Sequence, residues 1–147
     1  MRKLVLGVAI AAGLCGSALG ENEGVPRRMS YETMPTGKDF DRLYPPRALG
    51  EGLSGTTVMC CKLLPDRTYN CTLAYESPAG YGFGAAALEM SKKFRMTPES
   101  YEMFKGEVVR TPITFLLGGP ASKEAQAQLD NIREATQDIC KPGKPVA

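Results

Sequence analysis

The stretch 55–94 constrains the fold most, because its pattern is that of two extended strands joined by a tight turn and followed by a helix. Residues 57–63 and 69–75 each place apolar side chains on one face with the two-residue period of a half-buried strand. Pro65 and Asp66 stand between the two runs, and both are residues that favour turns. The stretch therefore predicts an antiparallel hairpin with one buried face.

The register of this hairpin predicts a disulfide. Closing the turn over 64–67 brings Cys61 opposite Cys71, and facing residues of an antiparallel pair have α-carbons roughly 4.5 to 5.5 Å apart. A disulfide accepts roughly 4.4 to 6.8 Å, so a bond fits. Two reduced core cysteines are the alternative. The same register makes two further pairs on this face, Leu63 with Tyr69 and Met59 with Leu73.

The N-terminus has the pattern of a secretory signal. Arg2 and Lys3 precede an apolar run over 4–19, and small residues at 18 and 20 stand where a signal peptidase cleaves. The run is shorter than the roughly 20 residues of a membrane-spanning helix. We therefore expect cleavage after residue 20 and a periplasmic protein, with an uncleaved inner-membrane anchor as the alternative. An exported chain can form disulfides.

Charge and composition argue against several classes of function. Removing residues 1–20 removes Arg2, Lys3 and no acid, so the formal net charge falls from +2 to 0. A neutral chain has no electrostatic basis for binding nucleic acid or an anionic membrane surface. The chain has no histidine, which excludes Ser–His and Cys–His nucleophiles and most zinc sites. We predict no enzymatic activity, no metal and no cofactor, and contact with a membrane only through a protein partner.

The segments on either side of the hairpin differ in regularity. Residues 21–42 are polar and have no hydrophobic period, so a flexible arm is expected. Pro45 or Pro46 in a first helical turn predicts a short helix that ends at Gly50. After the hairpin, apolar residues recur every three or four positions over 83–95, which is the period of an amphipathic helix.

Two more elements follow toward the C-terminus. Residues 108–117 alternate like a strand, and Pro112 places part of it at an edge or a bulge because proline cannot donate to a ladder. Ser122 can cap a last helix over 123–140, whose apolar residues repeat with four- and three-residue spacing. This apolar stripe predicts that the helix packs on the domain.

The two remaining cysteines could fix that helix to the sheet. Four cysteines lie beyond the signal, an even number that allows two bridges in an exported chain. Cys60 faces away from Cys61, so a bond from Cys60 to Cys140 would hold the last helix on the opposite sheet face. Two free thiols or an intermolecular bond are the alternatives. The vicinal pair lacks the Cys-x-x-Cys spacing of redox motifs.

Several motifs, taken in order, resemble the C-terminal domain of TonB, the periplasmic energy transducer of Gram-negative bacteria. The resemblance covers about residues 43–117 and includes a cysteine-containing branch of the family. Its motifs are Tyr44-Pro45 with Ala48, similar to the opening Tyr-Pro-x-x-Ala; Gly55 and the strand after it; Cys61 followed by Cys71; the segment 76–84 with Gly80, Gly82 and Phe83; and the closing strand at 111–115.

The resemblance implies an α+β fold, with a three-stranded antiparallel sheet packed by two helices, to which this chain adds a C-terminal helix. It implies that the last strand pairs with an extended segment of an outer-membrane TonB-dependent receptor or another envelope protein. The expected segments are a signal peptide (1–20), an arm (21–42), a TonB-like domain (43–117) and a C-terminal extension (118–147). The expected protein-binding edge is Val108, Val109, Arg110, Thr111, Ile113 and Phe115.

The chain also departs from the family. A full transducer has a transmembrane helix and a long proline-rich spacer, and here a signal-like start and a short arm are expected instead. Energy-dependent transport is thus implied by the resemblance and opposed by the missing spacer. The alternative function is a soluble structural or envelope-associated domain that uses the same fold without energy transduction.

Overall fold

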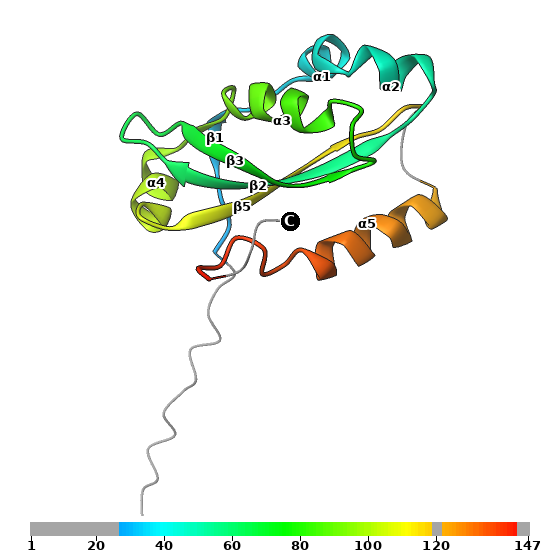
Figure 1. Ribbon diagram of the computed structural model, residues 1–147. Coiled ribbons are helices and arrows are strands. Elements are labelled where there is room, and N and C mark those ends of the chain that lie inside the picture. The colour runs from blue at the N-terminus through cyan, green and yellow to red at the C-terminus, as the bar shows by residue number, and fades with distance from the viewer. Residues whose placement is uncertain (1–26, 119–121, 144–147) are drawn as a thin grey trace, which may run out of the picture.

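The structure is a computed structural model that describes residues 27–118 and 122–143 (Figure 1). The predicted signal peptide lies outside the described residues. Within them, helices and strands follow in the order β1 (Tyr31–Thr33), α1 (Gly37–Leu43), α2 (Pro46–Gly50), β2 (Gly55–Leu63), β3 (Tyr69–Ser77), α3 (Phe83–Ser91), β4 (Arg95–Met96), α4 (Pro98–Phe104), β5 (Val108–Phe115) and α5 (Lys123–Ala135).

Three strands form one antiparallel sheet in the order β3-β2-β5. The helix α3 lies on one face of this sheet, and α5 runs along the opposite face (Figure 1). This confirms the prediction of an α+β fold with a three-stranded antiparallel sheet and an added C-terminal helix. The central strand β2 has a neighbour on each side and a helix over each face, so its residues 55–59 are all buried.

The hairpin has the register that the sequence predicts. Cys61 faces Cys71, and the pairs on either side are Leu63 with Tyr69 and Met59 with Leu73. The loop is one residue longer than 64–67, because the Leu64 N–H donates to the Thr68 carbonyl at 2.9 Å. Further along, Val58 faces Tyr75, so Ala74 is an extra residue on β3 and forms a bulge.

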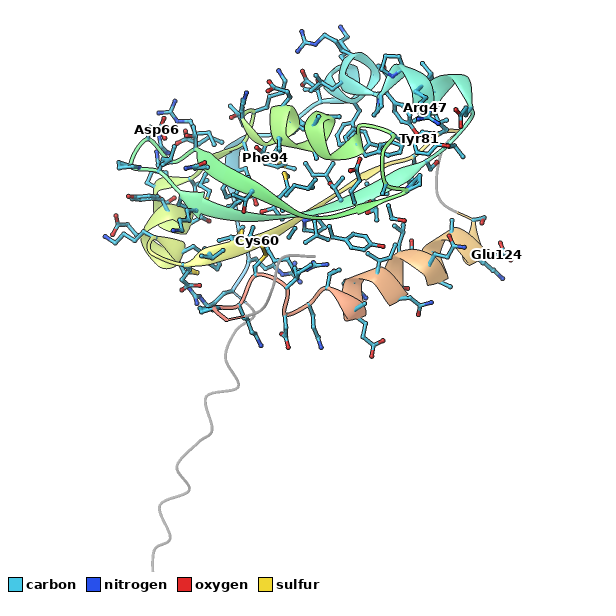
Figure 2. The ribbon with its side chains drawn as sticks, viewed as in Figure 1. Arg47, Cys60, Asp66, Tyr81, Phe94 and Glu124 are labelled. Atoms are coloured by element: carbon cyan, nitrogen blue, oxygen red, sulfur yellow. A yellow bond between two sulfur atoms is a disulfide. The ribbon has the colours of Figure 1, made fainter. Side chains whose placement is uncertain are left out.

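Both disulfides are present. The Cys61–Cys71 bond has its α-carbons 4.0 Å apart and lies on the α3 face, where Cys61 is completely buried. The Cys60–Cys140 bond joins residues 80 positions apart, and Cys60 lies on the α5 side of the sheet (Figure 2). Neighbouring strand residues point to opposite faces. Cys61 therefore links β2 to β3 on the α3 face, and Cys60 links β2 to the segment after α5 on the other face.

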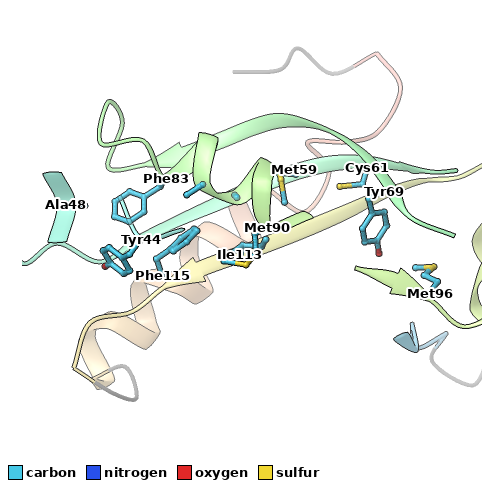
Figure 3. Close-up of a cluster of buried hydrophobic side chains, with 12 residues drawn as sticks. Tyr44, Ala48, Met59, Cys61, Tyr69, Phe83, Met90, Met96, Ile113 and Phe115 are labelled. Atoms are coloured by element: carbon cyan, nitrogen blue, oxygen red, sulfur yellow. The ribbon is translucent and has the colours of Figure 1, made fainter. Parts of the chain in front are cut away.

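The core lies between α3 and the sheet. At one end, the rings of Tyr44, Phe83 and Phe115 lie 5.5 to 5.8 Å apart between centroids, and the Tyr44 hydroxyl donates to the Leu53 carbonyl at 2.6 Å (Figure 3). The close approach needs a glycine: a β-carbon on Gly55 would lie 2.4 Å from the Phe83 ring. The absence of a side chain at Gly55 therefore lets the Phe83 ring at the start of α3 pack directly on β2.

A second aromatic group closes the other end of the core. Tyr31, Tyr69 and Phe94 pack with centroid distances of 5.2 to 6.4 Å, and the hydroxyls of Tyr31 and Tyr69 are 2.9 Å apart. Burial, together with the hydrogen bond between the Tyr69 and Tyr31 hydroxyls, raises the pKa of Tyr69 well above its ordinary value. This group joins the N-terminal segment to the hairpin.

The flexible arm predicted over 21–42 is wrong for its described part. Strand β1 pairs with β4, and α1 follows it. Helix α1 begins where the Asp39 carboxylate accepts hydrogen bonds from the Thr36 N–H and hydroxyl at 2.9 and 2.8 Å, which hold the pKa of Asp39 well below its ordinary value. Phe40 and Leu43 then pack against the core. These elements are too short to produce a sequence period.

Other boundaries also differ from the sequence-based expectation. Helix α3 ends at Ser91 rather than at 95, and the chain then forms the short strand β4. Thr97 and Pro98 begin the helix α4, because the Thr97 hydroxyl accepts a hydrogen bond from the Ser100 N–H at 3.2 Å. The last strand ends at Phe115 and α5 ends at Ala135. No helix in the described ranges is long and apolar enough to cross a membrane.

Candidate functional site

The outer edge of β5 is the candidate site that the sequence indicates. Among the described residues, β5 pairs only with β2. The Ile113 carbonyl accepts a hydrogen bond from the Thr57 hydroxyl at 3.2 Å, and the Leu117 N–H donates to the Ser54 hydroxyl at 3.1 Å. Odd-numbered residues thus turn their backbone groups toward β2. Because this direction alternates along a strand, even-numbered residues turn theirs outward.

Most side chains of the predicted edge do not face a partner. Val109, Thr111, Ile113 and Phe115 are buried on the α3 face, where the core holds them. A partner strand would therefore meet their strand through backbone groups rather than through these side chains. The remaining two predicted residues are Val108, which is exposed, and Arg110, which is partly buried on the α5 side.

Pro112 supports the assignment of β5 as an edge strand. Its ring is exposed, and as an even-numbered residue it lies where the backbone points outward. Proline has no N–H, so a donor is absent from the free edge and not from the ladder with β2. Prolines in sheets usually occupy such edge positions. Proline at this place also limits uncontrolled edge-to-edge pairing.

The predicted family-motif residues gather at one end of the core. Pro45 precedes α2, Ala48 is fully buried and Tyr44 packs on Phe83. Gly82 stands directly before α3 with φ of 90°, a conformation that favours glycine, and Gly80 has φ of 79°. Glu76 completes the start of α3, because its carboxylate accepts the Gly84 N–H at 3.0 Å. The motif residues therefore shape and anchor the two helices over the sheet.

Charged side chains lie on the surface of α2, at the same end of the sheet. The Arg47 guanidinium lies 4.5 Å from the centre of the Tyr81 ring, and Figure 2 shows these two side chains together. The Tyr81 hydroxyl donates to Glu51 at 2.8 Å, and this bond with that from Arg47 lowers the pKa of Glu51. The group fixes the 76–82 loop onto α2.

An apolar hollow at the C-terminal end of β5 was not predicted. It has a volume of about 350 Å³, and two leucines on its lining are strongly exposed, Leu49 at 54% and Leu116 at 40%. Phe40 and Tyr44 line it from α1 and the residue after it. The alternation over 108–117 contained Leu116, but the contribution of α1 and α2 depends on tertiary packing. Asp41 also lines the hollow, so it extends the edge of β5 with a partly apolar surface.

The N-terminal end of β5 is flanked by residues that precede β1. Arg27 forms an ion pair with Glu107 at 2.9 Å and lies 4.4 Å from the centre of the Phe104 ring. The Ser30 N–H donates to the Ser100 hydroxyl at 2.8 Å. The segment 27–30 is thus bound to α4 next to the first residues of β5.

Two links hold the C-terminal segment on the α5 side of the sheet. The Arg110 guanidinium donates through Nε and Nη2 to the carbonyl and hydroxyl of Thr136 at 2.9 and 2.6 Å. The second link is the Cys60–Cys140 bond. Burial and the nearby charge of Arg133 lower the pKa of Arg110 from its ordinary value. The described residues contain no group of three His, Cys, Asp or Glu side chains placed to hold a metal ion.

No protein-family model matches this chain, and no curated protein matches it.

Proposed function

We propose that this protein is a TonB-like domain, exported to the periplasm, that binds an extended segment of another protein as an added strand beside β5. The observation that carries the proposal is the unpaired outer edge of β5 within the described residues. In strand addition, backbone hydrogen bonds supply the affinity, and pockets for alternate side chains supply the specificity. The partner is an outer-membrane TonB-dependent receptor or another envelope protein.

The backbone of β5 defines which groups the partner would use. Residues 108, 110 and 114 would donate their N–H groups, and residues 108, 110, 112 and 114 would offer their carbonyls. Pro112 leaves one gap in the row of donors. Such a row supports a short segment rather than a long strand, because the outward backbone groups span only the eight residues of β5.

The apolar hollow at the end of β5 supports specificity. A strand that continues past Phe115 would bring a side chain beside Leu116 and Leu49. Burying one leucine-sized side chain there would contribute about 1.5–3 kcal/mol at most. An apolar residue at the matching position of the partner segment is therefore expected.

A role in energy-dependent transport would need a separate test. The resemblance to TonB favours it, and it would require a link from this domain to an energised membrane. The alternative is a structural or envelope-associated domain with the same fold and no bound segment. The two are separated by whether extended segments bind β5.

Hydrogen exchange provides a direct test of strand addition. The protein, with both disulfides oxidised, is titrated with synthetic peptides that cover the periplasmic segments of outer-membrane receptors. Binding at β5 is expected to slow exchange at amides 108, 110 and 114, because these point outward. Amides 109, 111 and 113 already lie in the ladder and should change little. Uniform slowing, or slowing only on β3, would contradict the proposed site.

A pair of variants at one position tests the same geometry. Thr114→Pro removes an outward N–H and should abolish binding, whereas Thr114→Val keeps the N–H and should bind as the wild type does. Both variants lose the hydroxyl contact with Thr56, so that loss is shared. Equal affinity of the two variants would refute edge pairing at this residue. Binding of no segment by the wild type would favour the structural alternative.

A further inference from the structure

The apolar stripe of α5 does not close onto the sheet. Ala125, Leu129 and Ile132 face the sheet but remain half-buried, and no residue between Lys123 and Ala135 is buried. Two cavities of about 160 and 150 Å³ lie between this stripe and the strands. Figure 1 shows α5 under the part of that face nearest to α2.

The two cavities form one continuous gap. Both are lined by Thr56, Thr114, Leu129 and Ile132, so they adjoin along the middle of α5. At one end the first is lined by the apolar residues Pro78, Leu116 and Ala125. The polar residues Ser54, Ser77 and Gln128 also line it. The second extends toward the other end over Val58 and Pro112.

Charged side chains line only the second end of this gap. Arg110 and Arg133 line it together with Asp130, so two guanidinium groups stand against one carboxylate. Arg133 lies 3.3 Å from Asp130 and is well exposed, whereas Arg110 is partly buried. Burial and the charge of Arg133 both disfavour the protonated form of Arg110, so an anion placed here would relieve the repulsion.

Covalent and polar links explain why the gap persists. The Cys60–Cys140 bond and the hydrogen bonds from Arg110 to Thr136 hold α5 beyond the C-terminal end of its stripe. The helix therefore stays over the sheet without a packed apolar interface. An empty gap forfeits dispersion contacts on both walls. Both cavities are open to solvent on one side, so a ligand could enter them from the surface.

We infer that the gap between α5 and the sheet binds a single-chain amphiphile with a carboxylate head, a medium-chain fatty acid. The tail would lie along Leu129 and Ile132 and extend toward Leu116, and the head would meet Arg110 and Arg133. The apolar walls and the positive end match the two parts of this ligand. The site is on the face opposite α3 and does not require the free edge of β5.

Decanoate is the probe for the first measurement. It is titrated into the oxidised full-length protein, below the concentration at which it forms micelles, and followed by calorimetry and by amide chemical shifts. One saturable site is expected, with shifts at Val58, Leu129 and Ile132. Each methylene removed from the chain should weaken binding about fourfold, so octanoate should bind about sixteenfold more weakly. The neutral analogue decanol should bind more weakly than decanoate.

Matched substitutions on α5 test the location. Ala125→Leu places a larger side chain in the first cavity and should weaken decanoate binding about tenfold or more. Ala127→Leu makes the same change two residues away on the exposed face and should leave binding unchanged. Arg133→Gln should weaken decanoate about two- to fivefold and should not change decanol binding.

Several results would overturn the inference. These are the absence of saturable binding, equal affinity of Ala125→Leu and Ala127→Leu, or shifts confined to β5 and the hollow beside Leu49. Tighter binding of decylammonium than of decanoate would refute the assignment of the head group. Shifts of α5 amides with the receptor peptides but not with decanoate would assign the gap to a protein segment instead.

Discussion

Breaking the Cys60–Cys140 bond should release α5 and leave the rest of the domain folded. The perturbation is the double variant Cys60→Ser, Cys140→Ser, which is tolerable because both cysteines are half-buried. The bond joins residues 80 positions apart. In the chain-entropy model, opening a loop of that length lowers the free energy of unfolding by about 4.5 kcal/mol.

The native state offsets part of this loss. Without the bond, α5 is retained by half-buried apolar residues and by the hydrogen bonds from Arg110 to Thr136. Ordering its 13 residues costs on the order of 1–2 kcal/mol each in backbone entropy. The free energy gained by partly burying the apolar residues of α5 is smaller than this cost. The helix therefore detaches, the folded state gains freedom, and the measured loss should be smaller than 4.5 kcal/mol.

Native-state hydrogen exchange combined with urea unfolding measures both effects. Amides of α5 should exchange at nearly unprotected rates in the double variant, while those of β2 and β5 keep the protection set by global unfolding. The control is Cys61→Ala, Cys71→Ala, which opens a loop of 10 residues on the core face. It should lower stability by at least about 2.7 kcal/mol and leave α5 protected. Persistent protection of α5 without the Cys60–Cys140 bond would show that packing, not the bond, holds the helix.

Three further predictions concern the core and two titrating groups. Gly55→Ala should destabilise by about 1–3 kcal/mol in urea, because its β-carbon would lie 2.4 Å from the Phe83 ring, whereas Gly50→Ala meets nothing within 4 Å and should change stability little. The raised pKa of Tyr69 means that the stability it contributes is retained below pH about 10 and is lost above it. In Tyr69→Phe, the urea midpoint should therefore change less between pH 9 and 11 than in the wild type. The lowered pKa of Asp39 contributes stability above pH about 4 that is lost on acidification, so Asp39→Asn should be less stable at pH 7 and less sensitive to acid.

The hairpin and the helices with a clear period could be predicted because their determinants are local. The two-residue period of 57–63 and 69–75 with a short turn leaves one register that buries both apolar faces. The stripe of α5 likewise predicts a helix from Lys123 onward. The segment 27–43 could not be predicted this way, since β1 and β4 are three and two residues long and exist through their pairing with one another.

The candidate sites were likewise predictable only in part. Pro112 in an alternating segment indicated an edge or a bulge, and the structure places it in an edge strand. The sequence did not indicate that four of the six predicted edge residues are buried, because that depends on which face α3 covers. The hollow at Leu49 and Leu116 and the gap beneath α5 each combine residues that are distant along the chain.

The sequence by itself determined the strand register, the pairing of Cys61 with Cys71 and the start of the last helix, since period, turn and capping act over a few neighbouring residues. Only the tertiary structure decided how α5 sits. The Cys60–Cys140 bond and Arg110 hold the helix at its C-terminal end, so its apolar stripe lies over a gap instead of closing onto the sheet. Packing distance is set by long-range links, and no local pattern encodes it.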